Sequence, residues 1–162
     1  MKKLNNPYTD MKGFNCFGCS PYNDKGLNLD FYEDGEEIVT YWHPKKEFQG
    51  WVNILHGGIQ STLMDELASW VVFIQCKSSG VTANLNIKFK KPVYTTDEKL
   101  TIRGKLDHMH KRIAKIKVKL YNSEGICCTQ GDIDYFVYPE KIARERFHYQ
   151  GVDAYYSEEP EE

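Results

Sequence analysis

Apolar residues recur at helical spacing in one long segment of the chain and at every second position in several shorter ones. From the glycines at 57 and 58 to Gln75, apolar side chains lie almost all round and no proline interrupts them, which predicts a mostly buried helix. Before this segment, residues 26–32 and 37–42 flank an Asp-Gly turn and predict a β-hairpin. After it come four alternating segments, at residues 81–89, 98–108, 112–121 and 125–137.

This order of two strands, one long helix and four strands predicts the α+β class. Consecutive hairpins favour a largely antiparallel sheet of about six strands, and a helix this apolar should lie against its concave face. We expect one domain at residues 26–138, preceded by a segment at 1–25. An extension at 139–162 should form a short helix followed by an acidic, frayed tail.

The composition is typical of a soluble globular protein, with 41% hydrophobic and 27% charged residues. There is no signal-peptide pattern and no run of apolar residues long enough to span a membrane, so we expect a cytoplasmic protein without membrane partners. A net charge of −2 argues against a dedicated nucleic-acid-binding protein.

Basic residues are nevertheless concentrated between residues 88 and 119, where eleven lysines and arginines face three acids. Part of this charge has a structural explanation, because lysines 115, 117 and 119 alternate with apolar residues and should form the solvent face of a strand. Lys88, Lys90 and Lys91 are instead candidates to meet the phosphates of a nucleotide-bearing substrate.

Five cysteines do not suggest a disulfide framework. Cys16 and Cys19 form a single Cys-x-x-Cys motif, and a structural zinc site would need a second pair that the sequence lacks. We therefore expect a packing or local-turn role for this motif, and no metal.

The most informative motif is His56-Gly57-Gly58 at the start of the long helix, followed by Asp65 among apolar neighbours. Two glycines allow close approach of a ligand to the backbone, and free N–H groups at a helix N-terminus favour an oxygen that gains negative charge. These are the properties of an oxyanion hole. Together with a carboxylate on the same helix, they indicate chemistry on an acyl group.

Helix geometry adds a constraint on these two groups. Gly57 and Asp65 are eight residues apart, which is roughly 12 Å at about 1.5 Å per residue. A reacting group must lie about 3 Å from the carbonyl that it attacks. The carboxylate would have to come from the antiparallel helix of a second copy, so a catalytic site here predicts a homodimer with shared sites.

With these motifs in place, residues 16–138 resemble the hotdog-fold thioesterases, in particular their PaaI-like branch. The resemblance rests on the Cys-x-x-Cys motif followed by Gly26-Leu27, on Phe48-Gln-Gly-Trp51 ahead of Ile54-Leu-His-Gly-Gly58, on the acid nine residues after the histidine, and on Asn86-Ile-Lys-Phe-Lys-Lys-Pro92. It implies a long helix wrapped by a curved antiparallel sheet, dimers that join their sheets and in some cases pair into a homotetramer, and hydrolysis of acyl-CoA without metal or cofactor.

The resemblance also implies residue roles. The Gly57 N–H would donate to the thioester carbonyl, Asp65 of the partner subunit would be the nucleophile or general base, and Thr82 would help to orient water. His56 would fix the glycine turn and touch the thioester region, with Gly58 beside it. One position departs from the family, because many relatives carry Asn or Gln where this chain has Gly50; the adjacent Gln49 is the candidate substitute.

Further residues are predicted to support the site. Ser69 lies four residues after Asp65, so it shares a helix face with the carboxylate and could donate a hydrogen bond to it. Aromatic residues suited to lining an acyl pocket are Trp51, Trp70, Phe73 and Tyr94, although core packing is the commoner role for such residues.

Two other functions stay open at this point. A non-catalytic protein that binds or senses acyl-CoA would keep the groove without the chemistry, and the departure at Gly50 leaves room for it. A hydratase or dehydratase of the same architecture ranks lower, because in those relatives the histidine and the acid have a different spacing.

Overall fold

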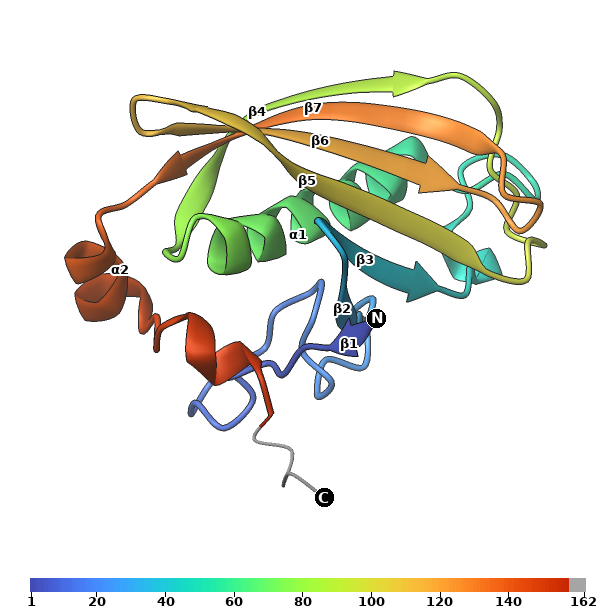
Figure 1. The fold of residues 1–162 in the computed structure, drawn as a ribbon. Helices are drawn as coiled ribbons and strands as arrows, with labels where there is room; N and C mark the ends of the chain where they lie inside the picture. The colour runs from blue at the N-terminus through green and yellow to red at the C-terminus, as the bar shows by residue number, and fades with distance from the viewer. Residues whose placement is uncertain (158–162) are drawn as a thin grey trace.

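A curved, wholly antiparallel sheet wraps around one long helix, α1 (Gly57–Gln75), in the computed structural model, which describes residues 1–157 (Figure 1). The order of strands in the sheet is β1-β2-β3-β5-β6-β7-β4. This confirms the predicted hotdog arrangement, with seven strands instead of about six. The strands are β1 (Lys2–Lys3), β2 (Phe31–Asp34), β3 (Glu37–Trp42), β4 (Gly80–Phe89), β5 (Leu100–His110), β6 (Ile113–Tyr121) and β7 (Cys127–Val137).

The core lies between α1 and the concave face of the sheet. Nine side chains of the helix are buried, and the sheet contributes alternating apolar residues of β5, β6 and β7. Alternation puts polar residues on the other face, where Lys115 pairs with Asp134 and Lys117 with Asp132. The prediction that these lysines form a solvent face is therefore confirmed.

The first predicted strand is wrong in its extent. Residues 26–30 are irregular, and β2 begins only at Phe31. The N–H groups of Leu27 and Leu29 donate to the carbonyls of Phe17 and Gly18, and Asn28 between them has a φ of 52°. The alternating leucines are buried against the Cys-x-x-Cys turn instead of pairing within the sheet.

Both flanking segments pack on the side of α1 that the sheet leaves open (Figure 1). The predicted C-terminal helix is present as α2 (Glu140–Phe147), and a 3-10 turn, η2 (Val152–Tyr155), follows it. Tyr155 is buried edge-on against Trp70, and its carbonyl accepts a hydrogen bond from the Asn5 N–H. The expected acidic tail lies, apart from Ser157, outside the described residues.

Among residues 1–157, no helix is long and apolar enough to cross a membrane. All five cysteines are free thiols.

Close contact between α1 and the sheet depends on a glycine in β5. A side-chain carbon at Gly104 would lie 2.7 Å from the Lys117 carbonyl oxygen and 2.8 Å from a methyl group of Leu67. The backbone oxygen has little freedom to move away.

We therefore expect Gly104→Ala to lower the free energy of unfolding by roughly 1–3 kcal/mol through overpacking, measured by urea denaturation. Gly50→Ala is the matched control, because the new methyl group there would make only ordinary contacts, at 3.5 Å or more. Equal stability of the two variants would contradict the proposed tight contact at Gly104.

Candidate active site

The start of α1 presents one free backbone donor. His56 is the N-cap residue, and its Nδ1 accepts a hydrogen bond of 2.8 Å from the Gly58 N–H. Ile59 and Gln60 donate to the His56 carbonyl. The Gly57 N–H donates to no other group among residues 1–157. The cap therefore occupies the N–H of Gly58, which was predicted to bind substrate, and leaves Gly57, the predicted donor, for a ligand.

A tight turn fixes the chain just before this helix. The Gly50 N–H donates to the Ile54 carbonyl at 2.8 Å, and the His56 N–H donates to the Phe48 carbonyl at 2.9 Å. Gln49, the candidate substitute for the missing family amide, uses its side-chain oxygen to accept from the Asn53 N–H. Its structural role is thus to close the turn, and only its NH₂ group stays available for a ligand.

Asp65 is held by two hydroxyl groups from the sheet. Its Oδ1 accepts hydrogen bonds of 2.8 Å from Thr82 on β4 and of 2.8 Å from Tyr135 on β7. The Tyr135 hydroxyl also lies 3.0 Å from the Asp65 carbonyl oxygen. Within residues 1–157, Oδ2 accepts no hydrogen bond. One carboxylate oxygen is therefore anchored and the other is free to meet a reactant.

Tyr135 was not among the predicted site residues. Burial, and then the negative charge of Asp65, raise the pKa of Tyr135 above its usual range, so the phenol stays protonated and remains a donor. Alternation along residues 125–137 predicts a buried aromatic residue at this position, but the sequence does not show that its hydroxyl reaches α1.

The predicted hydrogen bond from Ser69 to Asp65 is absent. Ser69 instead donates to the Glu66 carbonyl at 2.7 Å, the common bond of a helical serine to its own preceding turn. The Thr82 and Tyr135 hydroxyls donate to the Asp65 carboxylate in place of Ser69.

Glu66, the next residue of the helix, meets the Cys-x-x-Cys turn. The Cys16 thiol lies 3.6 Å from its carboxylate. Burial, and then the neighbouring Cys16, raise the pKa of Glu66 to about 7. A hydrogen bond from the Cys19 thiol lowers the pKa of Cys16 to about 5. The same hydrogen bond, and then burial, raise the pKa of Cys19.

Strand β4 is an exposed edge of the sheet, because it pairs only with β7. Apart from Gly80 and Ile87, every residue of the strand is exposed, and Leu85 and Phe89 leave 41% and 53% of their surface open. The pairing with β7 is irregular between Thr82 and Asn84, and such a bulge can turn a side chain toward a functional site. An unpaired edge with exposed apolar side chains offers a surface on which another strand can pair.

The end of β4 lies beside the start of α1. A side-chain carbon at Gly57 would be 3.4 Å from the ring of Phe89, and Lys90 and Lys91 follow directly. Both lysines are exposed, and neither pairs with an acid among the described residues. Lys88 lies on the outer face of the sheet by alternation with Phe89, which separates it from this group.

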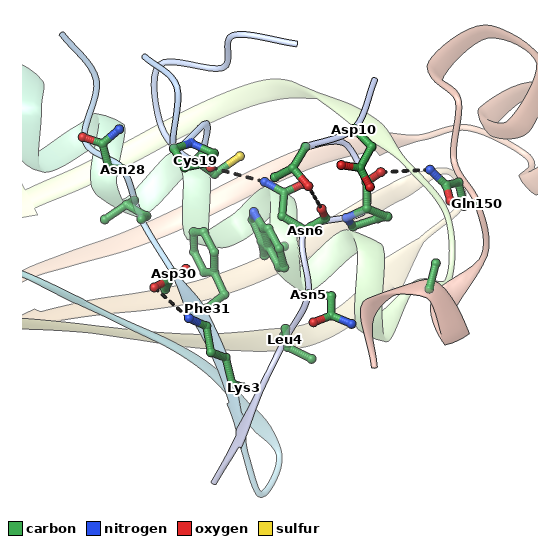
Figure 2. Close-up of a pocket in the computed structure, with 16 residues that line it drawn as sticks. Lys3, Leu4, Asn5, Asn6, Asp10, Cys19, Asn28, Asp30, Phe31 and Gln150 are labelled. Atoms are coloured by element: carbon green, nitrogen blue, oxygen red, sulfur yellow. Dashed lines mark hydrogen bonds and ion pairs between the residues drawn. The ribbon is translucent and has the colours of Figure 1, made fainter. Parts of the chain in front are cut away.

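The four aromatic candidates do not form one pocket. Trp51 and Tyr94 are exposed, at 82% and 48%. Trp70 and Phe73 pack with Tyr155 beneath the flanking segments. A cavity of about 480 Å³ borders Trp70 but lies between the N-terminal segment, β2 and η2, and includes neither Asp65 nor Gly57 (Figure 2).

A family model and a curated relative each match part of the chain. The sequence model of the thioesterase superfamily matches residues 52–129. An uncharacterised protein of Schizosaccharomyces pombe is 36% identical over 61 residues, which cover 37% of this chain and 35% of that protein. The chain thus matches about a third of the length of that curated relative.

Solved structures share the fold. A hypothetical thioesterase of Streptococcus pneumoniae in complex with coenzyme A is 24% identical, with a TM-score of 0.64, over 70% of this chain and 88% of that one. Structures of the same protein also exist with an aspartate or a threonine changed to alanine. The Streptococcus mutans protein smu.793 bound to acetyl CoA is 17% identical, with a TM-score of 0.66, over 81% and 98%. Escherichia coli PaaI is 16% identical, with a TM-score of 0.63, over 70% and 82%.

The bond from Tyr135 to Asp65 can be tested by stability. Tyr135→Phe removes only the hydroxyl, and loss of a hydrogen bond to a charged acceptor should lower the free energy of unfolding by roughly 1.5–3 kcal/mol. In an Asp65→Asn background the same change should cost less, because the acceptor there is neutral. Denaturant unfolding of the four proteins forms a double-mutant cycle; an equal cost in both backgrounds would show that the phenol does not depend on the carboxylate.

Proposed function

We propose, from the premise that the chain belongs to the thioesterase superfamily, that it is an acyl-CoA thioesterase that works as a homodimer. The observation that carries this proposal is the placement of Gly57 and Asp65 beside opposite ends of one edge strand, β4. Asp65 is bonded to Thr82 near the start of β4, and Gly57 lies against Phe89 at the end of β4. Two solved relatives of the same fold contain coenzyme A or acetyl CoA.

Antiparallel pairing of two β4 strands would complete the site. Pairing along their full length sets the Thr82 end of one strand opposite the Phe89 end of the other. Asp65 of each copy would then approach Gly57 of its partner. The same contact would cover Leu85 and Phe89, whose exposure on the helix side of the sheet favours a partner. A homotetramer remains a prediction, as does the cytoplasmic location.

In the proposed reaction, the thioester carbonyl oxygen accepts a hydrogen bond from the Gly57 N–H. Negative charge grows on this oxygen as the carbonyl carbon becomes tetrahedral, and the N-terminal end of α1 stabilises that charge. His56 positions the donor by capping the helix, since its ring holds the neighbouring Gly58 N–H. Its role is thus to fix the glycine turn.

The partner's carboxylate supplies the second group. Oδ1 is fixed by Thr82 and Tyr135, and the free Oδ2 either takes a proton from the attacking water or attacks the carbonyl carbon itself to form a mixed anhydride. In the first route the carbon–sulfur bond breaks as the carboxyl group returns its proton to the leaving sulfur, so that coenzyme A leaves as the thiol. In the second route the thiolate leaves first and takes a proton from solvent, and water then cleaves the anhydride, which releases the acid and restores Asp65. In the Streptococcus pneumoniae relative, an aspartate and a threonine have each been changed to alanine. Asp65 and Thr82 are residues of the same two types.

Lys90 and Lys91 are the proposed contacts for the phosphates of coenzyme A. They are exposed, lack acidic partners among the described residues, and follow the phenylalanine that borders Gly57. Lysine ammonium groups bind phosphate as point charges, which suits a flexible ligand at the surface.

Asp65→Asn should leave the fold and acyl-CoA binding nearly unchanged, yet abolish turnover. The substitution keeps the size of the side chain but removes the base or nucleophile. A thiol-release assay across short, long and aromatic acyl-CoAs measures the loss and names the substrate class. Tight acyl-CoA binding without thiol release by the unaltered protein would instead favour the non-catalytic alternative.

Removal of the Gly57 N–H should lower kcat by about 10²–10³. Gly57→Pro deletes this donor at the first helical position, where proline is well tolerated. Gly57→Ala is the matched control, because it adds a side-chain carbon next to Phe89 but keeps the N–H. Comparable activity of the proline and alanine variants would remove the oxyanion role from this amide.

A further inference from the structure

A second cluster of chemically active side chains lies beside the proposed active site. The thiols of Cys16 and Cys19 and a carboxylate oxygen of Glu66 lie within 4.8 Å of one another. Two of these residues come from the N-terminal segment and the third from α1, fifty residues further along the chain. None of the three has a role in the proposed thioester chemistry.

The turn that carries the cysteines is fixed from several sides. The Ser20 N–H donates to the Cys16 carbonyl, and Leu27 and Leu29 donate to the carbonyls between the two cysteines. The Asn6 side chain donates to the Cys19 carbonyl at 3.3 Å, as Figure 2 shows. Both thiols are thus presented by an ordered backbone, as a preformed binding site requires.

A glycine makes room for the carboxylate in this cluster. Any side-chain carbon at Gly18 would collide with the carboxyl group of Glu66. The carboxylate therefore occupies the space between the two cysteines that a larger residue would fill. Glu66 sits on the rigid helix α1, so its approach to the turn is set by the packing of the fold.

No basic side chain among residues 1–157 lines the cavity beside these acids. This apolar cavity, of about 300 Å³, borders all three residues. Two thiolates and a carboxylate at these distances repel one another unless they keep protons or share a cation. Thiolate and carboxylate ligands together suit Zn²⁺, which takes four ligands and accepts both types.

The Cys-x-x-Cys motif lacks a second cysteine pair, but the fold brings Glu66 to it as a third ligand, which the sequence did not reveal. We propose that Cys16, Cys19 and Glu66 bind one Zn²⁺ ion, with a water molecule from the cavity as the fourth ligand. Binding releases the thiol protons to solvent. The ion would fasten the N-terminal segment, which is mostly irregular between Asn5 and Asp30, to α1 at the residue next to Asp65. This role is structural, and it does not depend on the proposed thioesterase activity.

Zinc content and affinity test the site without reference to turnover. The full chain, purified without chelators, should contain one zinc per chain by mass spectrometry of the metal. After removal of the metal, titration with Zn²⁺ in competition with a chromophoric chelator gives the affinity, and Co²⁺ should produce a sulfur-to-metal charge-transfer band. Cys16→Ser and Cys19→Ser should abolish that band or weaken it strongly.

Glu66→Gln is the decisive variant, because it keeps the shape of the side chain and both thiols. It should weaken Zn²⁺ binding by more than about tenfold, whereas the control Cys127→Ser, a half-buried cysteine on β7, should bind like the unaltered chain. The proposal is overturned if Glu66→Gln binds zinc as tightly as the unaltered chain. It is equally overturned if the purified protein carries no zinc and a Cys16–Cys19 disulfide, which an intact mass two hydrogens lower would reveal.

Discussion

Gly57 and Asp65 lie on one straight helix, and the rise of that helix keeps the two groups roughly 12 Å apart. A single copy therefore cannot bring its own carboxylate to a carbonyl held at its own helix N-terminus. The sheet enforces the same separation, since Asp65 is tied to the beginning of β4 and Gly57 lies against its end. From Gly57 to Asp65, α1 runs in the direction opposite to β4. A twofold axis that pairs two β4 strands would therefore bring Asp65 of each copy to Gly57 of its partner and give two complete sites.

This arrangement links assembly to chemistry. An edge strand with exposed Leu85 and Phe89 favours association, and the residue that anchors the carboxylate, Thr82, belongs to the same strand. A free monomer already contains a hydrophobic core that α1 and the sheet share. It would have both reacting groups but no complete site, so under the proposed mechanism dissociation alone would stop turnover.

Residue patterns predicted the parts of the site that depend on local geometry. The double glycine and the apolar helix follow from short-range rules, and the structure has them where the sequence places them. Tyr135 and Glu66 were missed for a shared reason: their partners lie 70 and 50 residues away in the sequence, and only the tertiary packing brings them together. The prediction for Ser69 was wrong because its hydroxyl donates to the Glu66 carbonyl of the preceding helical turn, and not to the Asp65 side chain.

Mixing two defective chains tests the shared site most directly. Asp65→Asn and Gly57→Pro chains, carrying different affinity tags, are coexpressed and the heterodimer is isolated. One of its two sites would combine an intact Gly57 from one chain with an intact Asp65 from the other, so we predict about half of the unaltered activity per dimer, although each parent homodimer is nearly inactive. A heterodimer as inactive as its parents would show that each site draws both groups from a single chain, and would contradict the proposed mechanism.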